Sequence, residues 1–184
     1  GDLREKLTIA NLISATLDAY DRIDILVNAS RQVLASDFFD PEDKSVEISL
    51  EQNVLTSLRL SQHVAKRMIK QSEGQVGSIV NLSSIAARRA TSSLLGYSIS
   101  SAALDQMTRS MAVALAPRRI RVNAVAIGSV MSASLQKALK DHGDFRSDIE
   151  EHTPLARVAP ATEVAETVQY LASESAGFVT GHVL

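Results

Sequence analysis

Two spacings of apolar residues alternate along the chain. The spacing of a helix recurs over four stretches, 5–20, 46–71, 97–116 and 163–171. Short apolar runs rich in β-branched residues predict strands at 25–29, 78–83, 120–126 and 178–183. Strands joined through helices favour right-handed parallel crossovers, with helices on both faces of a mostly parallel sheet. The pattern therefore predicts an α/β fold of the doubly wound type, with ligands bound beyond the carboxyl ends of the strands.

The composition limits the size of the fold and its partners. The 184 residues, 45% of them apolar, are enough for one core and predict a single domain over residues 1–184. Basic and acidic residues number 19 and 21 and are spread along the chain, so a nucleic-acid partner is not expected. No run approaches the roughly 20 apolar residues of a membrane span. A cytoplasmic protein that does not enter the membrane is the resulting expectation.

Several kinds of catalytic site are not indicated by the sequence. The chain has no cysteine, which excludes disulfides, thiolate catalysis and cysteine-ligated zinc. Its 4 histidines are scattered without the spacing of metal ligands, so no metal site is expected. The Gly-x-Ser-x-Gly motif of serine hydrolases is absent as well.

Short motifs near the ends of the predicted strands follow one another in a fixed order. They occupy residues 24–30, 53–54, 79–84, 97, 121–128, 154–157 and 179–181. In order and spacing these motifs resemble the short-chain dehydrogenase/reductase family, and the resemblance covers essentially the whole chain. It implies a Rossmann-like doubly wound sheet, NAD or NADP as cofactor, and hydride transfer between that cofactor and a small carbonyl or alcohol substrate.

Three residues match the catalytic groups of that family. Ser84 matches a serine that orients the substrate, Tyr97 a tyrosine that donates a proton, and Asn53 an asparagine that holds a water in the proton-delivery chain. The residue types suit the reaction, because a hydroxyl stabilises the oxygen of a ketone under reduction and a phenol protonates it. Taken singly, a serine at a strand end is more often a cap and a tyrosine that opens a helix more often packs. The collinear motifs favour the catalytic interpretation.

The resemblance also implies cofactor-binding positions. These are Asn28, Ala29 and Ser30 after the first strand, Tyr97 and Ser101 at the nicotinamide ribose, and Ile127, Gly128, Val130 and Ser132 in the loop that holds the nicotinamide amide. The first stretch is one residue shorter than the family's and ends in serine. Asp2 matches an acid that binds the adenine, and it suits equally well the N-cap of the helix that follows.

Ser101 departs from the family pattern, because the family has a lysine four residues after the tyrosine. That lysine lowers the pH at which the tyrosine ionises, whereas an unperturbed phenol titrates near pH ~10. Its loss deprives alcohol oxidation of a base and affects ketone reduction less. The alternative prediction is therefore a catalytically inactive binding or scaffold protein.

The glycine-rich turn that binds the pyrophosphate in this family is absent as well. A βαβ unit takes about 30 residues, so roughly 60 residues are expected upstream, and the strand at 25–29 is expected to be an open sheet edge. The choice between NAD and NADP depends on that unit, and the choice of substrate on the stretch 131–153, where no chemistry is readable. The helical stretches 46–71 and 97–116 match the family's dimer-forming pair, which implies a homodimer or homotetramer.

Overall fold

Three parallel strands form the centre of the computed structural model, which describes residues 1–71, 77–132, 135–136, 139–140 and 145–184. The strands are β1 (Ile25–Asn28), β2 (Gly77–Ser84) and β3 (Ile120–Ile127), and they are hydrogen-bonded in the order β1-β2-β3. Ile25 pairs with Ser78, and Gly77 with Ile120. Each crossover between neighbouring strands runs through helices, so the predicted parallel α/β arrangement is confirmed.

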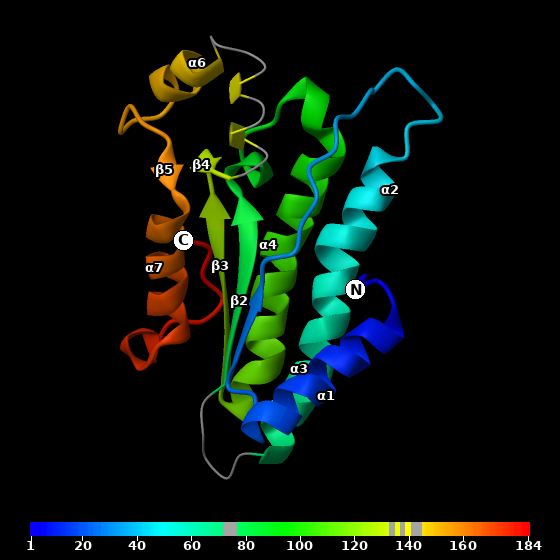
Figure 1. Cartoon of the computed structure of the whole chain (residues 1–184), viewed down its shortest axis with the longest axis vertical. Coiled ribbons are helices and arrows are strands. Elements are labelled where there is room, and N and C mark those ends of the chain that lie inside the picture. The colour runs from blue at the N-terminus through cyan, green and yellow to red at the C-terminus, as the bar shows by residue number, and fades with distance from the viewer. Residues whose placement is uncertain (72–76, 133–134, 137–138, 141–144) are drawn as a thin grey trace.

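Helices cover the sheet from both sides. Figure 1 shows α1 (Lys6–Tyr20), α2 (Ser45–Leu50), α3 (Thr56–Gln71) and α4 (Leu95–Leu115) on one side, and α7 (Ala161–Ala172) on the other. Ile79 and Val80 are successive residues of β2 and both are 0% exposed. Ile79 packs with the helices of the first side and Val80 packs with Leu171 of α7. Because successive side chains of a strand point to opposite faces, β2 is buried on both faces, as the doubly wound fold requires.

The predicted open edge lies at β1. Asn28 is buried and Leu26 packs against the core of the first side, whereas Ile25 is 51% exposed and Val27 39% exposed. The exposed pair alternates with the buried pair, so one face of β1 is covered and the other is not. An apolar, unpaired strand edge of this kind favours association with other chains.

Two predicted elements differ in the structure. The helix expected over 46–71 is interrupted by a π-helical segment, η1 (Glu51–Leu55), between α2 and α3. The strand expected over 178–183 is reduced to one bridge between Ala124 and Val183. Gly181 has a φ of +74°, which breaks the extended backbone. Its N–H still donates to the Val122 carbonyl of β3 at 2.7 Å, and the bridge follows two residues later.

The segment without a predicted element contains short ones. Strand β4 (Val130–Met131) pairs in parallel with β5 (Ala159–Pro160), and α6 (Phe145–Glu151) lies between them in the chain. Residues 133–134, 137–138 and 141–144 of this variable stretch lie outside the described residues. The remaining short elements are the 3-10 turns η2 (Ile85–Ala87), η3 (Ser92–Leu94), η4 (Ala116–Arg118) and η5 (Glu174–Ala176). None of the helices in the described ranges has the length and apolar character that crossing a membrane requires.

Candidate active site at the carboxyl edge of the sheet

Ser84 and Ile127 end adjacent strands at the same height. They are register partners of β2 and β3, and Ser84 Oγ donates a hydrogen bond to the Ile127 carbonyl oxygen at 3.3 Å. Ser84 Oγ also accepts from the Ala86 N–H at 3.2 Å, which caps the turn η2. The side chain is therefore a cap, as expected of a serine at a strand end, and it lies at the edge where parallel sheets bind ligands.

Tyr97 and Ser101 lie one helical turn apart at the start of α4. Tyr97 is 8% exposed, and the guanidinium carbon of Arg31 lies 4.7 Å from the centre of its ring. Ser101 is 3% exposed, and its carbonyl oxygen accepts a long hydrogen bond of 3.4 Å from Ser83 Oγ. The start of α4 approaches α2 closely because Gly96 has no side chain, since a Cβ there would lie 2.5 Å from the Ser45 carbonyl oxygen.

Asn53 lies in the π-helical segment and holds the loop after β1 against α4. Its Oδ1 accepts from the Gln32 N–H at 2.8 Å, and its Nδ2 donates to the Gln32 carbonyl at 3.0 Å and to Ser100 Oγ at 3.1 Å. π-Helical turns occur frequently at functional sites, where they redirect side chains. Asn53 is therefore bonded to two separate chain segments that border the same pocket.

Asn28 is bonded into the interior of the fold. Its Nδ2 donates to Ser61 Oγ at 2.9 Å and to Asn81 Oδ1 at 2.8 Å. Asn81 Nδ2 donates in turn to Thr108 Oγ1 at 2.9 Å. This buried chain of side chains connects β1, β2, α3 and α4 beneath the carboxyl edge, so the Asn28 amide joins neighbouring elements of the core.

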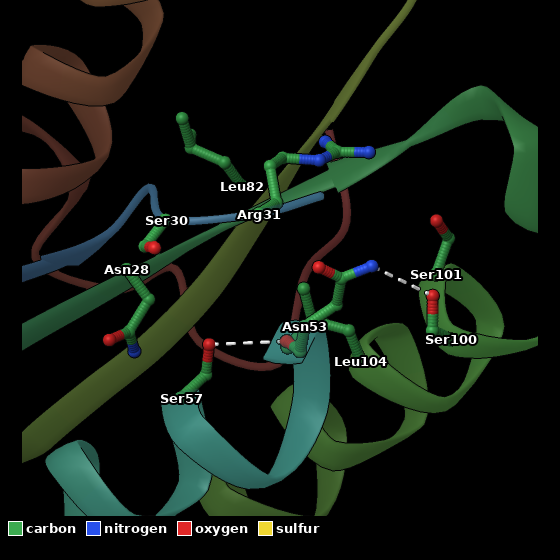
Figure 2. A pocket seen from close by; sticks show the side chains of 9 residues that line it. All are labelled: Asn28, Ser30, Arg31, Asn53, Ser57, Leu82, Ser100, Ser101 and Leu104. Atoms are coloured by element: carbon green, nitrogen blue, oxygen red, sulfur yellow. Dashed lines mark hydrogen bonds between the residues drawn. The ribbon is translucent and has the colours of Figure 1, made fainter. Parts of the chain in front are cut away.

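One pocket brings four of the predicted site residues together. Figure 2 shows Asn28, Ser30, Asn53 and Ser101 on its wall, with five residues that the sequence analysis did not assign, Arg31, Ser57, Leu82, Ser100 and Leu104. Ala29 is exposed beside it. Arg31 had a signal in the sequence, because it directly follows the motif that ends at Ser30.

The loop after β3 borders a second hollow. Ile127, Gly128 and Val130 line it, together with residues of the 153–167 region. A Cβ on Gly128 would meet only Ile85 Cδ1, at the ordinary contact distance of 3.6 Å, so the backbone at this glycine is not crowded. Ser132 is exposed and its Oγ accepts from the Leu135 N–H at 3.2 Å, which makes it a cap for the following turn rather than a wall of this hollow.

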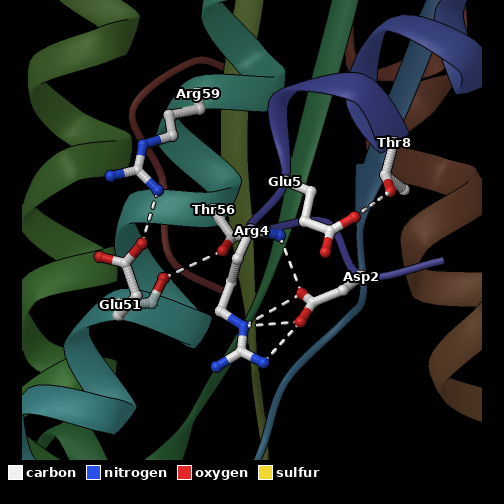
Figure 3. A network of polar contacts seen from close by, with 7 residues as sticks. All are labelled: Asp2, Arg4, Glu5, Thr8, Glu51, Thr56 and Arg59. Carbon is white, nitrogen blue, oxygen red and sulfur yellow. Dashed lines mark hydrogen bonds and ion pairs between the residues drawn. The ribbon is translucent and has the colours of Figure 1, made fainter.

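Asp2 lies in a third hollow. Ser30 lines both this hollow and the pocket shown in Figure 2. Its carboxylate accepts from the Arg4 N–H at 2.9 Å and pairs with the Arg4 guanidinium, as Figure 3 shows. The Arg4 side-chain hydrogen bond, before the other contacts, lowers the pKa of Asp2 to about 2. Helix α1 begins at Lys6 with Glu5 before it and without a side-chain cap, so the N-cap interpretation of Asp2 is wrong.

Comparison with known proteins decides the family. A family model described as enoyl-(acyl carrier protein) reductase matches residues 1–184. An uncharacterized oxidoreductase of Mycobacterium tuberculosis is 31% identical over 183 residues, which cover 100% of this chain and 68% of that protein. This chain belongs to the short-chain dehydrogenase/reductase family.

Relatives in the family include named enzymes. L-Xylulose reductase of Mus musculus is 33% identical over 162 residues, covering 88% of this chain and 65% of the enzyme. Among solved structures, 7α-hydroxysteroid dehydrogenase complexed with NADH and 7-oxo glycochenodeoxycholic acid has a TM-score of 0.91 and 27% identity, covering 100% of this chain and 69% of that chain. The structure of ElxO with NADP bound has a TM-score of 0.90 and 26% identity, covering 100% and 73%. The chain spans about two thirds of the length of the curated relatives it matches.

The pocket wall has a positive charge at Arg31 and none at Ser101. Burial lowers the pKa of Arg31 to about 10, which leaves the guanidinium protonated at neutral pH. Elsewhere in the described part of the chain, no group of histidine, aspartate and glutamate is arranged to hold a metal ion.

Proposed function

We propose that this protein is an NAD(P)(H)-dependent oxidoreductase that reduces a small carbonyl compound or oxidises the corresponding alcohol. The observation that carries the proposal is the position of three residues near the carboxyl edge of the sheet. Ser84 ends β2, Tyr97 lies at the start of α4, and Asn53 is hydrogen-bonded to α4 through Ser100. Membership of the family and relatives named as a reductase and a dehydrogenase support it. The activity of the relatives belongs to chains that are longer than this one.

The chemistry assigns a separate task to each hydroxyl. In the direction of reduction, the Ser84 hydroxyl donates to the carbonyl oxygen of the substrate and orients it, and the Tyr97 phenol passes its proton to that oxygen as negative charge develops there. In the direction of oxidation the Tyr97 oxygen accepts the proton. Asn53 fixes the loop after β1 against α4 and keeps the pocket wall in place.

The residues present fit an extended dinucleotide. Two hollows meet at Ser30, the one with Asp2 and the pocket with Ser101, and a third is lined by Gly128 and Val130 after the end of β3. The uncrowded backbone at Gly128, which lines one of these hollows, supports this fit. Asn28, Ala29, Ile127 and Ser132 are further candidates for contact with the dinucleotide. Bound NAD(P)H would supply the hydride.

The test is binding and turnover by the purified protein. Titration with NADH and NADPH, followed by cofactor fluorescence, is expected to give saturable binding, and a panel of sugar, steroid and other small carbonyls is expected to include a substrate. Tyr97→Phe should lower kcat by about 100- to 10,000-fold, the size of a general-acid contribution. Turnover that survives Tyr97→Phe unchanged would contradict the assignment.

A non-catalytic binding or scaffold protein is the second candidate, and the missing ammonium at Ser101 favours it. This candidate predicts cofactor or ligand binding without turnover on any carbonyl of the panel. Ser101→Lys separates the two candidates, because an active enzyme should gain in alcohol oxidation from the added charge. A scaffold should show no turnover with either residue.

A homodimer or homotetramer is also proposed. An apolar groove between α3 and α4, lined by Leu58, Ala65, Met107, Met111 and Leu115, supports this proposal, because it leaves apolar surface for a second copy. Small side chains at Ala102, Ala103, Ser110 and Ala114 permit close helix packing. Light scattering should give a mass of at least two chains. A monodisperse monomer would count against the proposed oligomer. The cytoplasmic location of the protein stays a prediction.

A further inference from the structure

Arg31 is a partly buried cation without an opposite charge. Its guanidinium lies 4.7 Å from the centre of the Tyr97 ring, and its Nη1 donates to the Ser83 carbonyl at 2.5 Å. In the part of the chain that the structure describes, no carboxylate forms an ion pair with it. Removing an unpaired charge from water is costly. The fold nevertheless holds this charge against the face of a phenol.

Ser83 connects the Arg31 guanidinium with the position of Ser101. The Ser83 carbonyl accepts from Arg31, and the Ser83 hydroxyl donates to the Ser101 carbonyl. Figure 2 shows Arg31 and Ser101 in the same pocket, from the loop after β1 and from α4. A charge from a distant part of the sequence therefore lies over the Tyr97 ring and on the wall of the pocket that the uncharged Ser101 also lines.

We propose that Arg31 is a positioning residue that supplies, from the loop after β1, the positive charge that Ser101 does not supply beside Tyr97. The inference rests on the proposed oxidoreductase function, in which Tyr97 exchanges a proton with the substrate. An opposite charge within about 6 Å stabilises the ionised form of a titrating group. A guanidinium stacked on the ring also holds the phenol in one orientation through its attraction to the ring face.

Other charged groups occur on the elements around Tyr97. They include Glu47 on α2, Glu51 in η1, Asp105 and the exposed Arg109 on α4, and Arg88 and Arg89 after η2. Glu51 is paired with Arg59 at 2.6 Å, and Glu47, Arg88 and Arg89 are exposed to water, which screens their charges. Asp105 lies two turns further along α4. Among all of these charged groups, the Arg31 guanidinium is the one that stacks on the Tyr97 ring.

Ultraviolet titration of tyrosinate tests the charge without cofactor or substrate. The chain has 3 tyrosines and no tryptophan, so subtracting the titration of Tyr97→Phe isolates the signal of Tyr97. Arg31→Gln keeps a hydrogen-bond donor and removes the charge, and it should move the ionisation of Tyr97 to higher pH by about 1 to 3 units. Arg31→Lys should keep most of the wild-type titration, which covers the case that the glutamine variant does not fold.

Two further variants sharpen the measurement. Arg31→Gln combined with Ser101→Lys should return the ionisation of Tyr97 toward the wild-type pH, because the charge is restored from α4. Arg118→Met removes an exposed arginine at the opposite end of β3 and should leave the titration in place. A titration that does not move in Arg31→Gln, or that moves as far in Arg118→Met, overturns the proposal.

The pH profile of alcohol oxidation separates this inference from the proposed function. In Arg31→Gln the rise of kcat/KM with pH should move to higher pH together with the ultraviolet titration. A shifted ultraviolet titration without turnover in any variant supports the charge assignment and contradicts the oxidoreductase function. Turnover that depends on Tyr97, with a profile that Arg31→Gln does not move, overturns the assignment and leaves the function standing. A gain in cofactor affinity and turnover on loss of the Arg31 charge overturns it too.

Discussion

Asn28 offers a sharp test of whether the polar groups beneath the carboxyl edge hold the fold together. Asn28→Ala removes both hydrogen bonds of the amide, to Ser61 and to Asn81. The Ser61 hydroxyl can rotate to another partner, whereas Asn81 Oδ1, on a side chain that is 0% exposed, loses its donor. A lost hydrogen bond contributes about 1 kcal/mol and an unsatisfied buried acceptor costs a further ~1–3 kcal/mol. The free energy of unfolding should therefore fall by about 2 to 4 kcal/mol.

Urea unfolding followed by circular dichroism measures this change. Asn11→Ala on the exposed face of α1 is the matched control and should stay within about 0.5 kcal/mol of the wild type. The costs of Asn28→Ala and Asn81→Ala should not add, because both break the same bond. A cost below about 0.5 kcal/mol for Asn28→Ala, with an unchanged slope in urea, would refute the view that the chain of amides supports the sheet.

Two further predictions concern packing and titration. Gly96→Ala should lower the free energy of unfolding by about 1 to 3 kcal/mol in the same assay, because its Cβ would lie 2.5 Å from the Ser45 carbonyl oxygen, while Gly128→Ala should leave it unchanged. The pKa of His152 is raised, first by the hydrogen bond to the Asp148 carbonyl and then by the Asp148 charge. Any stability that protonated His152 adds to α6 is therefore fully present below the pKa of this histidine in the unfolded chain. That stability is lost as the pH rises through the pKa of His152 in the folded protein. NMR titration should find a lower pKa of His152 in Asp148→Asn, though still a raised one, and an unchanged pKa would contradict this account.

The arrangement of strands and helices was predictable because it depends on burial, and burial is visible in the spacing of apolar residues. Strand β2 was predicted to within one residue at each end, since its β-branched residues are buried on both faces. The π-helical segment was not predicted, because one shifted turn scarcely alters the apolar spacing of 46–71. The last strand was predicted over too long a range, because apolar spacing does not reveal the positive φ of Gly181, which interrupts the extended backbone.

The polar contacts of the site were less predictable than its residues. The motifs identified Asn28, Asn53, Ser84 and Tyr97 as candidates, and the structure places each of them near the carboxyl edge. The motifs did not indicate that Arg31 would reach Tyr97, because that contact depends on the path of the loop and on the reach of a long side chain. Arg31 directly follows the matched motif that ends at Ser30, and only the path of the loop brings its side chain to the Tyr97 ring.

The lengths of the hydrogen bonds distinguish candidate residues that stabilise the fold from candidate residues that are available to react. The amides of Asn28 and Asn53 have their donors engaged by the protein, through bonds of 2.8 to 3.1 Å. Ser84 is held by longer bonds of 3.2 and 3.3 Å, which a substrate oxygen can replace at little cost. Substitution of the amides should therefore lower stability and activity together, whereas Tyr97→Phe should lower activity at nearly constant stability. Measuring both quantities on each variant distinguishes an active site from a polar core that only resembles one.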